Sequence, residues 1–234
     1  MSSNPPAKCC TIGVKHEAET YFAYPSSKST TNAILLLTDV IGHKFINAQL
    51  IADQFAANGY FVVMPDLFHG DPVKLNAPEG FQIMDWLKGH QTGAVDPIVD
   101  ACIKEMKGNL GVKSLGAVGY CFGAKYVARF LNQGQIDAGF VAHPSFVDDE
   151  EIKGMTGPFA IAAAETDQIF PTEKRHHTEE LLLKMDIPWQ INLYSDTEHG
   201  FAVRADLSKP VVKYAKEQAF LQAVHWFDEH IKKA

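Results

Sequence analysis

The chain of 234 residues has few of the features that mark secreted or membrane proteins. Its four cysteines, Cys9, Cys10, Cys102 and Cys121, are too few and too unevenly spaced for a disulfide framework. No apolar run approaches the roughly 18 residues of a membrane span, and the first residues lack the basic and apolar regions of a secretory signal. These absences predict a reduced, cytoplasmic protein.

Positive charge is also sparse. The 21 lysines and arginines form no dense patch, and with 28 aspartates and glutamates the formal net charge is −7. Such a chain lacks the basic surface that attracts nucleic acid or an anionic membrane, so neither is expected as a partner. The ten histidines include no His-x-x-x-His pair, and the cysteines include no Cys-x-x-Cys pair, so no metal site is predicted.

Hydrophobic residues make up 46% of the chain, which is enough for a large core. Apolar runs without alternation at 33–38 and 60–64 are typical of strands that are covered on both faces. Between them, apolar residues recur at helical spacing over 45–58, which implies a right-handed crossover and parallel pairing. We therefore predict an α/β fold, with a mostly parallel central sheet and helices on both faces, in one domain spanning 1–234.

The same patterns predict the other elements. An antiparallel pair of strands or an edge strand is expected within 11–24. Further strands are expected at 115–118, 139–142, 158–166 and 189–194, and helices at 96–110, 124–131, 173–185 and 211–231. Cys102 lies on the apolar face of one of these helices, so we interpret it as a buried packing residue.

Residues 67–93 form the least regular stretch, with several prolines and glycines. An irregular segment of this length in a compact domain is more often the rim of an active site than a plain connection. Its side chains Phe68, His69, Phe81, Met84 and Trp86 either line a pocket or form a small core of the loop itself. The sequence leaves both interpretations open.

The segment Gly119-Tyr120-Cys121-Phe122-Gly123 fits the G-x-S-x-G nucleophile elbow, with cysteine in place of serine. The flanking glycines let strand and helix cross closely, while Cys121 takes a strained backbone conformation that pushes its side chain out above the sheet. At a helix N-terminus the dipole favours a negative sulfur, and the amide of Phe122 would face an oxyanion. The loop after the strand at 33–38 supplies a second amide in this arrangement, and Val40 is the candidate.

An acid and a histidine follow in the order that the nucleophile-elbow arrangement requires. Asp167 follows the strand at 158–166, and His199 lies in the turn after the strand at 189–194. We therefore predict a catalytic triad in which His199 takes the proton of Cys121. In this triad Asp167 orients the imidazole and stabilises its cation.

Neighbouring residues allow other interpretations. Glu165 and Glu198 are also acidic, but the acid of this arrangement belongs in the loop just past its strand. His143 ends a strand as well, and a structural role is favoured because the required histidine is already present. Without catalysis, Cys121 would be an inert buried thiol and Asp167 a turn residue. The catalytic interpretation is favoured because three independent placements agree with one template.

A cysteine thiolate attacks activated carbonyls readily but is also a good leaving group, which suits esters, thioesters and lactones better than amides. The predicted reaction passes through an acyl-thioester that is hydrolysed by a water molecule activated by the histidine. Two alternatives are a thioesterase or acyltransferase with the same triad, and a non-catalytic ligand-binding protein on a hydrolase fold.

Four segments resemble the dienelactone hydrolase (carboxymethylenebutenolidase) family. They are Val118–Ala124, Glu165–Asp167, Glu198–Arg204 and Pro65–Asp71. The resemblance covers nearly the whole chain from residue 9 onward, and the Cys9-Cys10 leader looks like that of fungal members. It implies an α/β-hydrolase fold, a triad of Cys121, Asp167 and His199, and hydrolysis of an enol-lactone without cofactor or metal.

Two features depart from the pattern of bacterial members. Asp39 stands where they place a glutamate that restrains the thiol. They also bind the substrate carboxylate with two arginines, whereas residues 67–93 contain none and Arg204 lies one position later than expected. We therefore expect a more apolar small-molecule ester or lactone as substrate, bound by a monomer or homodimer. The residues expected around it are Asp39, Phe68, His69, Trp86, Tyr120, His143, Phe201 and Arg204.

Overall fold

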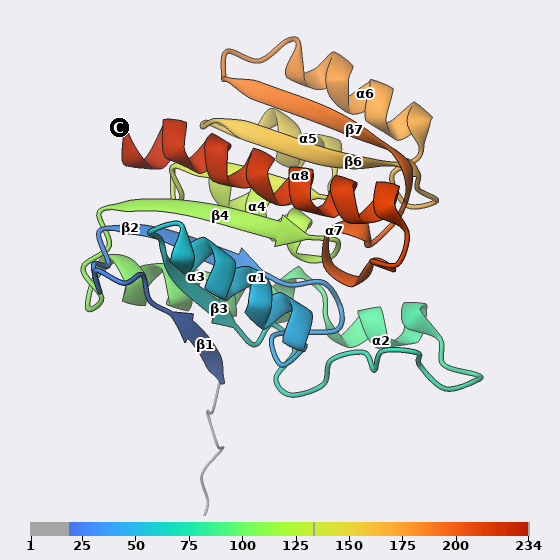
Figure 1. Cartoon of the computed structure of the whole chain (residues 1–234), viewed down its shortest axis with the longest axis horizontal. Helices are drawn as coiled ribbons and strands as arrows, with labels where there is room; N and C mark the ends of the chain where they lie inside the picture. The colour runs from blue at the N-terminus through green and yellow to red at the C-terminus, as the bar shows by residue number, and fades with distance from the viewer. Residues whose placement is uncertain (1–18, 133, 234) are drawn as a thin grey trace, which may run out of the picture.

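A computed structural model describes residues 19–132 and 134–233, which form a seven-stranded sheet with helices on both faces (Figure 1). The strands lie in the order β1-β3-β2-β4-β5-β6-β7, and all neighbours are parallel except β1 and β3. They are β1 (Thr20–Ala23), β2 (Asn32–Leu37), β3 (Phe61–Pro65), β4 (Ser114–Tyr120), β5 (Ala138–Ala142), β6 (Phe159–Thr166) and β7 (Trp189–Glu198). The predicted α/β fold with a mostly parallel sheet is confirmed.

The central strands are covered on both faces, as their unbroken apolar runs predict. All residues of β5 are buried, and so are all but the first residue of β2 and of β4. Side chains of a strand alternate between the two faces, so burial of both faces requires apolar residues at successive positions. The hydrophobic core consequently forms two layers, one on each side of the sheet.

Each core layer is closed by its own helices. One face is covered by α1 (Ile46–Ala57) and α8 (Pro210–Phe227), with the short α7 (Phe201–Arg204) beside them (Figure 1). The other face is covered by α3 (Thr92–Lys107), α4 (Gly123–Leu131), α5 (Asp149–Lys153) and α6 (Thr172–Leu182). In the described part of the chain, no helix has the length and hydrophobicity needed to cross a membrane.

The elements differ from the predicted ones mainly at their ends. The stretch at 67–93 is more regular than predicted because it contains α2 (Ile83–Gly89), and α3 begins at Thr92 rather than at residue 96. The sequence patterns do not predict α5 or α7, since helices of five and four residues are too short to show a helical period. Residues 11–18 of the predicted edge strand, together with Cys9 and Cys10, lie outside the described residues.

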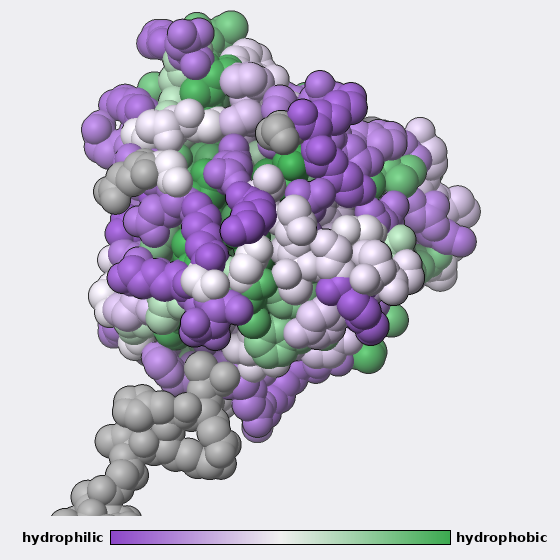
Figure 2. Space-filling model, turned by 90° about the vertical axis from the view of Figure 1, so that its left-hand side faces the viewer, coloured by the Kyte–Doolittle hydropathy of each residue, from purple (hydrophilic) through white to green (hydrophobic). Residues whose placement is uncertain are grey.

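The strand register brings several strand ends to one edge of the sheet. Tyr120 of β4 pairs with Ala142 of β5, and Thr166 of β6 pairs with Glu198 of β7. The residues that follow these ends therefore meet at the carboxyl edge, where open parallel sheets bind ligands. They are Cys121, His143, Asp167 and His199. Figure 2 shows the opposite edge, where hydrophilic side chains are widely spread between smaller apolar areas.

Candidate active site

Cys121 lies on a strained turn between β4 and α4. Its φ angle is +50°, in the left-handed region that side chains other than glycine rarely adopt, and the residue is only 5% exposed. A Cβ atom at Gly123 would lie 2.1 Å from the carbonyl oxygen of Leu37, and one at Gly119 would lie 2.8 Å from the Cα of Ala124. Both positions thus require glycine so that the strand and the helix can approach this closely.

Asp167 and His199 form a hydrogen-bonded pair at the ends of β6 and β7. The Nδ1 atom of His199 lies 2.8 Å from Oδ2 of Asp167. The other carboxylate oxygen, Oδ1, accepts hydrogen bonds from the amides of Ile169 at 2.8 Å and Phe170 at 3.0 Å. The carboxylate and the two amides that hold it, all on the loop after β6, therefore fix the orientation of the imidazole.

The charges of this pair stabilise each other. Burial raises the pKa of Asp167, but the hydrogen bond from His199 and the two backbone amides outweigh it and hold the pKa below its usual 3.8. Burial lowers the pKa of His199, but the hydrogen bond with Asp167 and the nearby sulfur of Cys121 outweigh it and raise the pKa to about 9. The imidazole is therefore a strong proton acceptor beside the thiol.

Ser145 is a residue of this site that the sequence analysis does not single out. Its hydroxyl oxygen lies 3.3 Å from Sγ of Cys121 and 3.5 Å from Nε2 of His199, and the residue is buried. Its backbone amide donates a hydrogen bond of 3.0 Å to the carbonyl oxygen of Cys121. Its position in the sequence could have predicted this place, because it lies just beyond β5, at the same edge of the sheet as Cys121.

His143 lies beside the pair but without polar partners. Its ring centroid is 5.0 Å from that of His199 and 5.8 Å from that of Phe201, in edge-to-face arrangements. Among the described residues, neither ring nitrogen of His143 has a hydrogen-bond partner. Complete burial, followed by the nearby charges of His199 and Arg204, lowers its pKa well below 6.5. His143 is thus held neutral.

An ion pair joins the loop after β2 to α7. The Nε atom of Arg204 lies 3.0 Å from Oδ2 of the buried Asp39, and Oδ1 of Asp39 accepts a hydrogen bond from the amide of Ile41. Val40 lies on the same loop, and its carbonyl oxygen accepts a hydrogen bond from the amide of Val73 at 2.8 Å. Arg204 therefore has a carboxylate partner within the protein.

The sequence matches one known family along almost its whole length. The family model described as "Dienelactone hydrolase family" matches residues 18–231. The chain belongs to the dienelactone hydrolase family. Membership confirms the predicted resemblance, and it makes the chain a hydrolase of carboxylic esters or lactones.

Fungal hydrolases are among its relatives. Hydrolase pyvD of Aspergillus violaceofuscus is 52% identical and covers 100% of both chains. Dienlactone hydrolase 1 of Gibberella moniliformis is 33% identical and covers 97% of this chain and 94% of its own. Among solved structures, the dienelactone hydrolase of Anabaena variabilis has a TM-score of 0.68 at 11% identity and covers 91% of each chain, which shows a shared fold.

Aromatic residues of the rim pack on the residue that follows Cys121 in this dienelactone hydrolase family member. The ring of Phe68 lies 5.0 Å from Trp86 and 5.2 Å from Phe122 in edge-to-face contacts. Trp86 also stacks on His90 at 4.0 Å, and its indole N–H donates to the carbonyl oxygen of Asp71. These contacts form a small core of the loop itself, and that core packs directly against Phe122.

Two other predicted pocket residues lie away from this cluster. His69 is exposed on a turn with φ of +52°. Tyr120 is buried in the core layer under α1 and α8, because successive side chains of a strand point to opposite faces. It lines a second cavity of about 550 Å³ on that face.

Cys102, which was predicted to be a buried packing residue, is part-buried rather than fully buried. Burial raises the pKa of its thiol to about 12.

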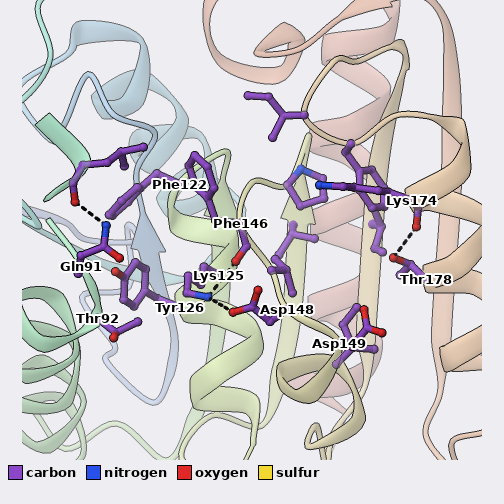
Figure 3. Close-up of a pocket in the computed structure, with 18 of the residues that line it drawn as sticks. Gln91, Thr92, Phe122, Lys125, Tyr126, Phe146, Asp148, Asp149, Lys174 and Thr178 are labelled. Carbon is purple, nitrogen blue, oxygen red and sulfur yellow. Dashed lines mark hydrogen bonds and ion pairs between the residues drawn. The ribbon is translucent and has the colours of Figure 1, made fainter. Parts of the chain in front are cut away.

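A cavity of about 870 Å³ adjoins the strand ends. Its lining includes Phe122, Pro144 and Gln168, which directly follow Cys121, His143 and Asp167 in the sequence. Figure 3 shows this cavity between α4 and α6, with aromatic side chains on one side and Lys174 on the other. Its apolar wall is formed largely by Phe122, Tyr126, Val141, Ile152, Phe159, Ile161 and Phe170.

The described part of the chain assembles no candidate metal centre. Within 19–132 and 134–233, no three His, Cys, Asp or Glu side chains lie close enough together to hold a metal ion. The polar groups of the site instead contact one another, as the bonds of Ser145 and Asp167 show.

Proposed function

We propose that this member of the dienelactone hydrolase family cleaves small carboxylic esters or lactones through a triad of Cys121, Asp167 and His199. The observation that carries the proposal is the 2.8 Å bond between His199 and Asp167, at the edge of the sheet where Cys121 occupies its strained turn. A buried carboxylate that orients an imidazole beside a nucleophile is the geometry by which such triads are recognised.

In the first half of the reaction, His199 takes the thiol proton of Cys121 on Nε2 and the thiolate attacks the substrate carbonyl. The amides of Phe122 and Val40 stabilise the oxyanion, and loss of one such donor typically costs about 3–4 kcal/mol of transition-state stabilisation. The amide of Phe122 suits this role because it precedes α4, where the first N–H groups have no partner within the helix. The imidazolium then protonates the leaving alkoxide, and an acyl-thioester remains on the sulfur.

In the second half, water enters beside the thioester. His199 removes one proton from the water while the hydroxide attacks the acyl carbonyl. The tetrahedral adduct collapses with Cys121 thiolate as the leaving group, and the imidazolium returns its proton to the sulfur. Asp167 stabilises the imidazolium in both halves, which agrees with the raised pKa of His199.

The proposed substrate has a bulky apolar part. The cavity of about 870 Å³ lies in the upper range of small-molecule sites, and its wall is mainly aromatic and aliphatic. Arg204 is engaged by Asp39 and is less available to clamp a substrate carboxylate. A lactone or ester with a ring system or a branched acyl group fits these surroundings better than a small dianion does.

The test compares hydrolysis of p-nitrophenyl acetate by the native protein, Cys121→Ala and the matched control Cys102→Ala. We expect turnover by the native protein and by Cys102→Ala, and a fall in kcat/KM of about 10³-fold or more in Cys121→Ala. Acid-quenched mass spectrometry should find a transient acetyl group on Cys121. Equal activity of all three proteins, with no acetyl group on Cys121, would contradict the proposed triad.

A further inference from the structure

Ser145 occupies a position between the two groups that exchange a proton in the proposed reaction. Its hydroxyl oxygen lies 3.3 Å from Sγ of Cys121 and 3.5 Å from Nε2 of His199. The residue is only 1% exposed, so bulk water does not compete freely for these contacts. A hydroxyl has one donor and two acceptor positions, so it can receive a proton from one neighbour while it passes one to the other.

The direction of these hydrogen bonds follows from the bond between Nδ1 of His199 and Asp167. Asp167 is ionised, because its pKa is held below 3.8, and it can only accept a hydrogen bond. Before it takes the thiol proton, the imidazole of His199 is neutral, so it carries its one proton on Nδ1, toward Asp167, and presents Nε2 as an acceptor. The hydroxyl hydrogen of Ser145 then points to Nε2, and its oxygen is free to accept the S–H hydrogen of Cys121.

The backbone holds Ser145 in this position. Its amide donates to the carbonyl oxygen of Cys121 at 3.0 Å, while the amide of Cys121 donates to the carbonyl oxygen of Ala142 at 3.1 Å. Two residues with positive φ angles, His143 at +39° and Phe146 at +60°, flank the segment. Strained backbone of this kind persists where the surrounding structure fixes it, and it concentrates at functional sites.

We propose that Ser145 is a further catalytic residue, which relays the proton from the thiol of Cys121 to Nε2 of His199. In this step the S–H bond breaks and its proton forms a bond to Oγ of Ser145. The original hydroxyl proton leaves Oγ and forms the N–H bond of the imidazolium, and the electron pair of the S–H bond stays on sulfur. Ser145 ends the step as a hydroxyl that donates a hydrogen bond to the thiolate. The inference rests on the proposed triad.

The test measures kcat/KM for p-nitrophenyl acetate, which reports acylation, in the native protein, Ser145→Ala, Ser145→Thr and Cys121→Ala. Thr197→Val is the matched control, because it removes another buried hydroxyl, which bonds to backbone groups and not to the sulfur or to Nε2. We expect Ser145→Ala to lose about 10²-fold in kcat/KM, Ser145→Thr to keep most of it, and Thr197→Val to remain close to native. Urea unfolding confirms that each variant is folded.

A proton inventory separates a relay from simple support of the turn. In mixtures of light and heavy water, kcat/KM of the native protein should depend on the deuterium fraction in a curved manner, because two protons move together. Ser145→Ala should follow a different, straighter dependence, because one proton moves. Identical inventories in the two proteins, or native kcat/KM in Ser145→Ala while Cys121→Ala is inactive, would overturn the relay.

A different result would contradict the proposed triad itself, namely unchanged activity in Cys121→Ala.

Peptide mass mapping of the acetylated protein gives one more outcome. An acetyl group on Ser145 instead of Cys121 would make the serine a nucleophile and would also overturn the relay.

Discussion

The ends of β5 and β7 each present a histidine at the carboxyl edge of the sheet, yet the two side chains have opposite electrostatic properties. His199 bonds to a buried carboxylate, and its pKa is raised to about 9. His143 lies 5.0 Å away, ring to ring, without a polar partner among the described residues, and its pKa is lowered well below 6.5. A place at the carboxyl edge of the sheet therefore does not by itself make a histidine basic. A charged partner such as Asp167 raises its pKa.

The difference arises from what each strand end faces. The loop after β6 supplies Asp167 to His199, and two backbone amides hold that carboxylate in place. The ring of His143 instead faces Tyr120, Phe201 and the ring of His199. A protonated His143 would be desolvated beside a second cation, so it stays neutral and fills space. In the proposed reaction one ring holds a proton while the other packs against it.

The largest contrast should appear in activity. We expect His199→Asn to lower kcat/KM for p-nitrophenyl acetate by about 10³-fold or more, because it removes the proposed base. His143→Phe keeps a flat ring of similar size and should retain activity within about tenfold, because no proton transfer depends on it. Steady-state kinetics of the two folded variants measure the contrast. Similar losses in both would mean that His143 takes part in the chemistry.

A second contrast should appear in the pH dependence of stability. The folded-state pKa of His143 is depressed, so its contribution is present above about pH 6.5 and is lost as the pH falls below that value. The folded-state pKa of His199 is raised, so its contribution is present below about pH 6.5 and is lost as the pH rises through about 9. The two residues therefore stabilise the fold in different pH ranges.

Urea unfolding at several pH values measures how the free energy of unfolding depends on pH. His143→Phe should remove part of the loss of stability below pH 6.5, and His199→Asn should remove part of the loss between pH 6.5 and 9. The change in His199→Asn should be of order 3 kcal/mol, since its pKa rises from 6.5 to about 9 and one pKa unit corresponds to about 1.4 kcal/mol. If the free energy of unfolding of both variants depended on pH as in the native protein, the opposite pKa shifts of the two histidines would be contradicted.

The sequence predicts the fold because its signals are local. Unbroken apolar runs at 33–38 and 60–64 indicate buried strands, and β2 and β3 occupy these positions. The elbow is predictable for the same reason, since its glycines and Cys121 are adjacent in the chain. Asp167 and His199 follow because each directly succeeds a strand, and parallel strands bring such residues to one edge. Their 2.8 Å bond is the consequence of that topology.

Contacts that depend on loop conformation are not predictable in this way. Asp39 and Arg204 are 165 residues apart in sequence, and their ion pair depends on the placement of α7. The hydroxyl of Ser145 contacts Cys121 from a loop in which the nearby His143 has a φ angle of +39°. A sequence pattern contains neither the sign of that angle nor the direction of the side chain that follows it.

The smallest effect should be on the stability of His143→Phe near pH 7.5. Each ring nitrogen of His143 is buried without a hydrogen-bond partner among the described residues, which is costly for a polar atom. Phenylalanine replaces both nitrogens by carbon in a similar shape, so we expect unfolding free energy to stay constant or to rise by up to about 1 kcal/mol. His143→Ala is the matched comparison, because it leaves a cavity beside Phe201 and should cost about 3 kcal/mol. Urea unfolding measures both variants. A loss of more than about 2 kcal/mol in His143→Phe would mean that the ring nitrogens have partners, such as bound water, and that His143 resembles His199 more than its surroundings indicate.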